Sequence, residues 1–341
     1  MKEVIDMKRR MLFLILISSI LFVMATACNG KDINEIGNQL VDNIEFDKAE
    51  GDVGSHEEKL MEEFNNAIKG DIEPFVLVKL IDENIGKVKT NVATEMINRL
   101  EEIQLGYIDR YTEELFMEEY QMELITLSEI FNSNSEDKEY SVEDYLFFDV
   151  EKIEEIKNEN LKQLVERIIE GKFKLINMEG AYYPIIDYEG LKVYGDYISE
   201  EMNDYLDLKS MESNMPVILD GGITISFDEL AERLIKTENY ILKYPDGQKY
   251  EEVLRLYGIY LKFYFEGSPN TLIYDYESKI IKDEVLASYE RLKNMEETVI
   301  SQVVSKYIDI IMENDNIIDE SVLSKVTELH SQAVAALEGQ N

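Results

Sequence analysis

Residues that commonly build catalytic and metal centres are scarce in this sequence. Its 341 residues include one cysteine, two histidines and no tryptophan. A lone cysteine excludes an internal disulfide, and a Ser-His-Asp triad would depend on His56 or His330, with no Gly-x-Ser-x-Gly elbow in the sequence. His-Glu-x-x-His, Cys-x-x-Cys, Walker and Gly-x-Gly-x-x-Gly motifs are also absent. We therefore expect no catalytic residues of these types, no cofactor and no metal held by His and Cys.

Basic residues are the minority charge. The chain has 34 lysines and arginines against 71 aspartates and glutamates, a formal net charge of −37. Such a chain is repelled by nucleic acid and by anionic lipid headgroups, so we exclude direct nucleic-acid binding. Acidity does not indicate disorder here, because 45% of the residues are hydrophobic, with 21 tyrosines and 13 phenylalanines. The composition predicts a soluble domain with a sizeable core.

The N-terminal 28 residues carry the most specific pattern. Three basic residues at positions 8–10 precede an almost wholly apolar run, Met11–Met24. That run is short for a membrane span and suits the core of a signal peptide. Small residues, Ala25-Thr26-Ala27, then lead into the only cysteine, Cys28. This segment resembles the lipobox of bacterial lipoprotein precursors.

The lipobox resemblance implies a location. It implies that residues 1–27 are a signal peptide removed before Cys28, and that Cys28 carries a diacylglyceryl thioether with palmitate-type chains. Two acyl chains hold a protein on a membrane far more firmly than one. We therefore expect a protein anchored on the extracytoplasmic face of a cell membrane. The alternatives are an ordinary signal peptide or an uncleaved N-terminal anchor.

The rest of the chain is predicted to be mainly α, a multi-helix bundle of either one body or two helical subdomains. Residues 28–54 read as the lipidated cysteine and a flexible tether, 55–131 as an N-terminal helical region, 132–140 as a polar linker and 141–341 as a C-terminal helical domain. Apolar stripes at helical spacing lie within 96–111 (continuing towards 131), 161–176, 191–205, 227–242, 250–265, 278–314 and 320–337.

At most one small β-hairpin is expected, from Val217–Leu219 and Ile223–Ile225 through Asp220-Gly221-Gly222. Its turn matches the middle of an EF-hand loop. However, Phe227 stands where that loop has its glutamate, and carboxylates are missing at the first ligand positions. We therefore predict a β-turn and no metal site.

Charged residues inside apolar stripes are the first candidate functional positions. Glu238 lies three or four residues from Leu234 and Ile241, so it should face the core. Lys172 lies likewise within the 161–176 stripe, and Glu179 extends the same face. An unpaired buried charge is costly, so we consider a Lys172–Glu238 ion pair, with solvated side chains or a ligand site as the alternatives.

The densest polar-aromatic segment, 179–188, is the second candidate and is expected to join two helices. Its candidate ligand-binding residues are Glu179, Tyr182, Tyr183, Asp187 and Tyr188. Tyrosines beside carboxylates suit a site for a sugar, a peptide or an amine cation. They suit equally a packed corner whose hydroxyls are hydrogen-bonded.

These observations favour a membrane-anchored, non-catalytic binding or interaction module whose partner is an unidentified protein or cell-wall component. One alternative is a cell-wall hydrolase that uses two carboxylates among Glu179, Asp187, Glu212 and Glu238. Another is a cation-responsive surface protein.

Overall fold

Helices make up most of the chain that the computed structural model describes, namely residues 53–117, 119–128, 146–295 and 298–339. The mainly α class is therefore confirmed. The predicted signal peptide, Cys28 and the 132–140 linker lie outside the described residues, and so does nearly all of the predicted tether. The division into regions 55–131 and 141–341 stays a prediction.

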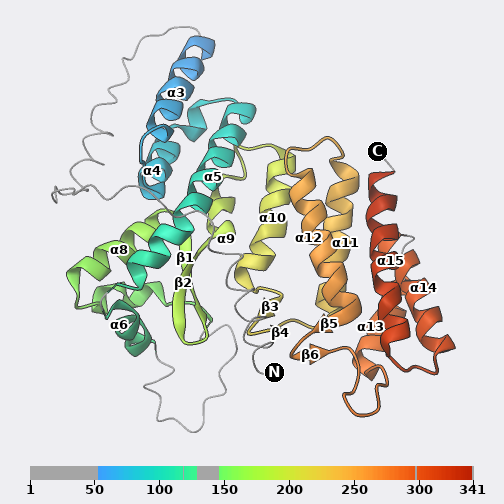
Figure 1. The fold of residues 1–341 in the computed structure, drawn as a ribbon. Helices are drawn as coiled ribbons and strands as arrows, with labels where there is room; N and C mark the ends of the chain where they lie inside the picture. Colours follow the sequence, from blue (N-terminus) through green and yellow to red (C-terminus); the bar gives the residue numbers. More distant parts are fainter. Residues whose placement is uncertain (1–52, 118, 129–145, 296–297, 340–341) are drawn as a thin grey trace, which may run out of the picture. The chain divides into compact units, whose positions relative to one another are not determined.

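The first half of the described chain surrounds a hairpin with helices. Its elements are α3 (Val53–Ile68), α4 (Pro74–Asn84), η1 (Ile85–Lys87), α5 (Thr90–Leu115), α6 (Tyr120–Leu127), η3 (Val150–Glu155), α8 (Glu159–Glu170), β1 (Phe173–Met178), β2 (Ala181–Ile186), α9 (Tyr188–Leu191) and η4 (Lys192–Tyr194). Helix α4 packs against α5 and α8, and strand β2 lies against α5 and α6 (Figure 1).

Helix α5 buries most of the stripe predicted from its spacing. The buried stripe residues are Met96, Leu100, Tyr107 and Tyr111. The predicted continuation towards residue 131 is wrong, because α5 ends at Leu115 and α6 begins afresh at Tyr120. Between them Phe116 leaves helical geometry (φ −94°, ψ 4°) and packs its ring 5.2 Å from that of Tyr183 on β2.

The predicted helix over 161–176 is also wrong beyond residue 170. Helix α8 stops at Glu170, and the chain then forms the antiparallel β1–β2 hairpin, in which Phe173 pairs with Ile186 and Met178 with Ala181. The turn residues Glu179 and Gly180 both have positive φ (51° and 81°), which gives the turn twist that two-residue hairpins favour. Burial alternates along β2, as expected for a strand with one face on the core.

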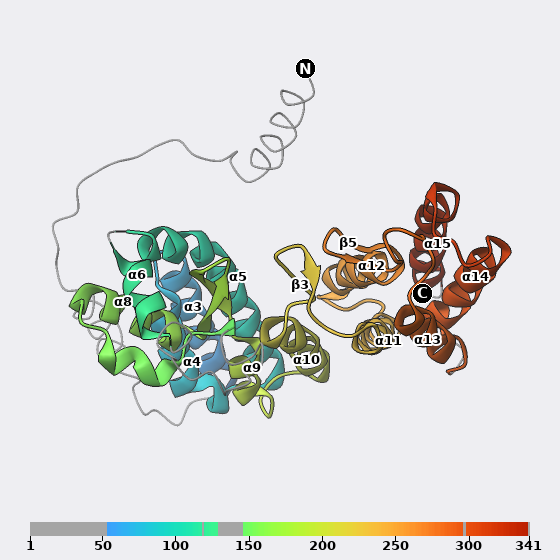
Figure 2. The same cartoon turned by 90° about the horizontal axis from the view of Figure 1, so that it is seen from below.

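The second half is a set of packed helices centred on α11. Its elements are α10 (Glu200–Asn214), β3 (Ile218–Leu219), β4 (Gly222–Ile223), α11 (Phe227–Lys243), α12 (Tyr250–Glu266), β5 (Gly267–Ser268), β6 (Thr271–Leu272), α13 (Asp283–Lys293), α14 (Val299–Glu313) and α15 (Glu320–Glu338). Helix α11 contacts α10 and each of α12 to α15, and α14 lies beside α15 (Figure 2). The helices predicted over 227–242, 250–265 and 320–337 are confirmed.

A single helix over 278–314 was expected, and the structure divides that stretch. Helix α13 ends at Lys293 and α14 begins at Val299. The start of α14 carries a capping box, in which Thr298 and Ser301 satisfy each other's backbone N–H groups. Both segments bury apolar residues at helical spacing, so periodicity alone did not reveal the break.

The expected β3–β4 hairpin is confirmed, with Asp220 and Gly221 as its turn residues (φ 47° and 71°). The expected limit of one hairpin is wrong, because two more antiparallel hairpins occur in the described residues, β1–β2 and β5–β6. Hairpin β5–β6 lies beside hairpin β3–β4, since the Asn270 N–H donates to the Gly221 carbonyl (3.0 Å). These loops tie the ends of α10, α11 and α12 together.

Gly267 provides a test of this arrangement. Its φ of 71° is unfavourable for other residues, and an added Cβ would lie 2.4 Å from the Thr271 carbonyl oxygen. We expect Gly267→Ala to lower the free energy of unfolding by about 2–3 kcal/mol, measured by urea titration. Gly106→Ala is the control: Gly106 lies in α5 with no atom within 4 Å of the added Cβ, and this change should stabilise the protein by about 0.5–1 kcal/mol. Equal losses in both variants would contradict the assignment.

Candidate functional site

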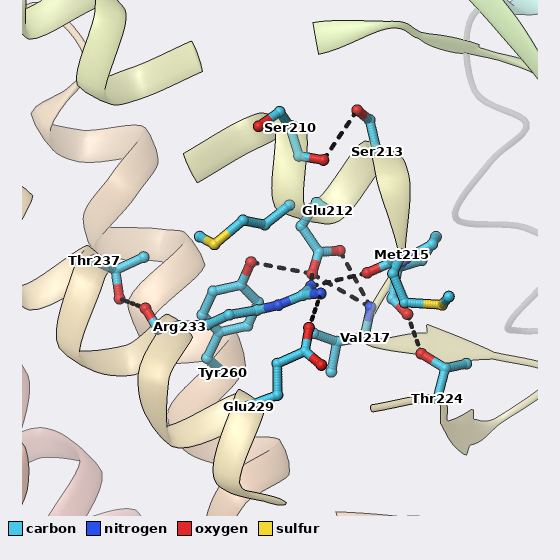
Figure 3. A network of polar contacts seen from close by, with 12 residues as sticks. Ser210, Glu212, Ser213, Met215, Val217, Thr224, Glu229, Arg233, Thr237 and Tyr260 are labelled. Atoms are coloured by element: carbon cyan, nitrogen blue, oxygen red, sulfur yellow. Dashed lines mark hydrogen bonds and ion pairs between the residues drawn. The ribbon is translucent and has the colours of Figure 1, made fainter. Parts of the chain in front are cut away.

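Glu212, in the last turn of α10, meets side chains from two other helices (Figure 3). Its Oε1 accepts hydrogen bonds from Arg233 Nη1 on α11 and from the Tyr260 hydroxyl on α12, both at 3.0 Å. The Val217 N–H, at the start of the β3–β4 hairpin, donates to the same carboxylate at 3.3 Å. One carboxylate therefore joins three helices and the hairpin.

Arg233 is the buried cation of this cluster, with 2% of its surface exposed. Its Nη1 also donates to the Met215 carbonyl (2.9 Å), and its Nη2 donates to Glu229 (2.7 Å). Its Nε is buried without a hydrogen-bond partner among the described residues. Burial raises the pKa of Glu212, and Arg233 opposes that shift; burial also raises the pKa of Tyr260, which keeps its phenol protonated as a donor.

Glu238 faces the core, as its position in the stripe predicts, with 1% exposure. Its carboxylate accepts the N–H groups of Val299 (2.6 Å) and Ile300 (2.9 Å), the first residues of α14, and the Tyr257 hydroxyl lies 3.5 Å away. Glu238 thus caps α14 from a different helix, because free N–H groups at a helix N-terminus attract a carboxylate. Burial raises its pKa, against the lowering effect of these hydrogen bonds.

The suggested Lys172–Glu238 ion pair is wrong. Lys172 lies in the turn between α8 and β1 (φ 60°), not on a helix face, and its ammonium is 6.0 Å from the Tyr194 ring centroid. Glu179 is exposed at the β1–β2 turn. Both misplacements follow from the strand that replaces the predicted end of the helix.

The 179–188 segment does not join two helices but forms strand β2 and the start of α9. Tyr182 is fully buried with its ring edge-on to Phe148, and its hydroxyl has no hydrogen-bond partner among the described residues. Strand alternation sends Tyr183 to the opposite face. Asp187 lies 3.9 Å from Lys174 Nζ. These side chains therefore do not converge on one site.

Tyr188 belongs to a buried cluster that sequence reasoning missed. Glu101 on α5 accepts the hydroxyls of Tyr188 (2.7 Å) and Tyr205 (2.5 Å), and it is ion-paired with Lys249. The Tyr205 hydroxyl also lies 2.8 Å from Glu252 on α12. The available signal was the position of Glu101, four residues after the buried Ile97, which is the spacing rule that identified Glu238.

Charges in this second cluster are balanced. Lys209 lies 2.8 Å from Glu252. Burial favours a raised pKa for Glu252, but Lys209, Tyr205 and Lys249 outweigh it and lower that pKa. Burial raises the pKa values of Tyr188 and Tyr205 far above neutrality. The cluster is therefore a fixed arrangement of ion pairs and phenol donors that links α5 to α9, α10 and α12.

The carboxylates considered for hydrolysis are not brought together. Glu179, Asp187, Glu212 and Glu238 share no hydrogen-bond or ion-pair partner with one another within the described ranges. The same ranges contain no group of three or more His, Cys, Asp or Glu side chains able to hold a metal ion.

A groove of about 520 Å³ lies between α10 and α11. Lysines and aspartates line its sides, together with Leu208, Met211 and Tyr240. No described helix is long and apolar enough to span a bilayer. Comparisons of the chain with protein-family models, curated proteins and solved structures found no match.

The raised pKa of Glu238 leads to a prediction about the pH dependence of thermal stability. Its folded pKa is raised above the ordinary value of 4.5, so its stabilising contribution is complete below that value and is lost as pH rises through the folded pKa. We expect Glu238→Gln to reduce the gain in Tm on acidification from about pH 8 to about pH 5. Glu232→Gln, at an exposed position of the same helix, should keep the wild-type slope. Identical slopes in all three proteins would show that the folded pKa of Glu238 is not raised.

The ion pair of Arg233 with Glu212 leads to a prediction about stability. Arg233→Met leaves Glu212 without its cation and should cost about 3 kcal/mol of unfolding free energy. The double variant Arg233→Met/Glu212→Gln should lose less unfolding free energy than the sum of the losses in the two single variants, because the two groups interact directly. The control is Arg291→Met, whose exposed pair with Asp228 should contribute less than about 1 kcal/mol. Strict additivity in urea unfolding would show that the pair is not coupled.

Proposed function

We propose that this protein is a lipid-anchored, extracytoplasmic lipoprotein whose helical body is a non-catalytic binding or interaction module. The proposed location rests on the basic, apolar and small-residue pattern that ends at Cys28. The net charge of −37 adds support, because it keeps the body away from anionic headgroups and leaves attachment to the lipid.

The observation that carries the non-catalytic role is that the buried Glu101 and Glu238 and the half-buried Glu212 are occupied by donors of the protein itself. Glu212 is held by Arg233, Glu238 by the N-terminus of α14, and Glu101 by Lys249 and two phenols. General acid or base catalysis requires a carboxyl group within reach of a substrate. These clusters therefore favour a structural role for the carboxylates. The α10–α11 groove, one of several hollows in the described part of the chain, is our proposed recognition surface.

The anchor is tested by expressing the full-length chain in bacteria fed an alkyne-tagged palmitate analogue. We expect the tag on the wild-type protein, in a membrane fraction that resists washing with high salt. Cys28→Ser should remove the tag completely, because the thioether needs the thiol.

Thr26→Ser is the matched control, since it keeps a small residue in the same segment. It should retain the tag and the membrane association. A tagged Cys28→Ser protein, or an untagged wild type, would rule out lipidation at Cys28.

A further inference from the structure

Two exposed isoleucines lie side by side where the chain leading into α13 meets the chain leading into α15 (Figure 1). An antiparallel bridge joins Ile280 to Ile317. The next residues, Ile281 and Ile318, are buried, whereas Ile280 is 50% and Ile317 38% exposed. Successive side chains of an extended chain point to opposite faces, and directly opposed residues share a face. Ile280 and Ile317 therefore form the outer side of the bridge.

Tyr276 extends this surface. It lies in the turn closed by the hydrogen bond from the Asp275 N–H to the Ile280 carbonyl (2.9 Å). Its side chain is 74% exposed, and the Lys279 ammonium lies 4.6 Å from its ring centroid. Single exposed apolar side chains are normal on a protein surface, whereas a group of them indicates an interaction site. We call Tyr276, Ile280 and Ile317 the apolar face.

Exposed carboxylates without partners flank the apolar face. Elsewhere on the surface an exposed acid such as Asp228 is paired, in that case with Arg291 at 2.6 Å. Beside the apolar face, no ion pair or side-chain hydrogen bond to another described residue is found for Glu277, Asp283, Glu284, Glu313, Asp315 and Glu320. Unpaired charges of one sign around an apolar centre attract a surface of the opposite sign.

This charge selects among possible occupants of the apolar face. A second copy of the chain would bring the same carboxylates, and anionic headgroups would be repelled in the same way. The segments 28–52 and 129–145, outside the described residues, also contain more acidic than basic residues. A basic segment of another protein is the occupant that charge favours.

We propose that the apolar face binds an extended segment of a partner protein in which lysines or arginines alternate with aliphatic residues. The aliphatic side chains cover Tyr276, Ile280 and Ile317, and the basic side chains pair with the flanking carboxylates. Alternation suits this arrangement, because an extended segment presents its aliphatic side chains on one side. The apolar face is separate from the α10–α11 groove and adds a partner class to the proposed function.

The test is fluorescence anisotropy of a labelled probe peptide in which lysines alternate with valines, titrated with the full-length chain in detergent. A second probe, with serines in place of the valines, has the same charge. We expect saturable binding of the valine peptide and at least about tenfold weaker binding of the serine peptide, because only valines cover apolar surface.

Variants locate the binding surface. Tyr276→Ser and Ile280→Thr should each weaken binding of the valine peptide by about fivefold or more. Ile259→Thr changes an isoleucine of α12 that is also 50% exposed but lies outside the apolar face, and it should leave the affinity unchanged. Glu277→Gln should weaken binding by about two- to threefold, whereas Glu232→Gln on α11 should not.

Thermal melting of each variant separates lost binding from lost folding, and Tyr276→Ser should keep the wild-type Tm because its side chain is mostly in solvent. No saturable binding, equal binding of the serine peptide, or unchanged affinity in a folded Tyr276→Ser protein would overturn the proposal. A dimer, or binding to phosphatidylcholine vesicles, that Tyr276→Ser abolishes would assign the apolar face to a second copy or to lipid instead. The lipid anchor and the non-catalytic role are tested separately and would stand in each case.

Discussion

Burying a carboxylate without a partner is costly, and a chain with 71 acidic residues has to meet that constraint repeatedly. It does so in three ways. Glu212 is paired with a buried guanidinium, Glu101 with an ammonium and two phenols, and Glu238 with two backbone N–H groups at the start of α14. Each of these carboxylates contacts groups on other helices. The interactions that satisfy the acidic side chains therefore also hold the helices of the bundle together.

The helices were predictable where an apolar stripe and clear end signals coincide. Helix α11 begins after Ser226, whose hydroxyl accepts the Glu229 N–H, and it ends at Lys243, just before the turn-forming residues Pro245 and Gly247. The β1–β2 hairpin was not predicted, because Leu175 and Ile176 continue the apolar spacing of α8. In addition, the dipeptide Glu179-Gly180 is not a strong sequence signal for a hairpin turn. Likewise, the break between α13 and α14 depends on Thr298 and Ser301, whose capping role is seen only in the structure.

Less of the candidate site could be predicted, and the reason is physical. Side-chain spacing shows which way Glu238 faces, but its partners are backbone N–H groups about sixty residues away, and these have no signature in residue type. Arg233 was overlooked because a long side chain in a stripe suggests solvation by its flexible end. Here its guanidinium instead donates to three acceptors, two at the C-terminal end of α10 and one on α11.

The Arg233–Glu212 pair and the α10–α11 groove are built on the same two helices. Arg233 and Lys236 lie three residues apart on α11, and their contacts on α10, Glu212 and Met211, are adjacent. Arg233 is buried, whereas the Glu212 side chain is 29% exposed, and their hydrogen bond joins α10 to α11 at that level. One turn away the Lys236 ammonium meets Met211 across the groove between the same two helices. The ion pair therefore contributes to the positions of the side chains that line this groove.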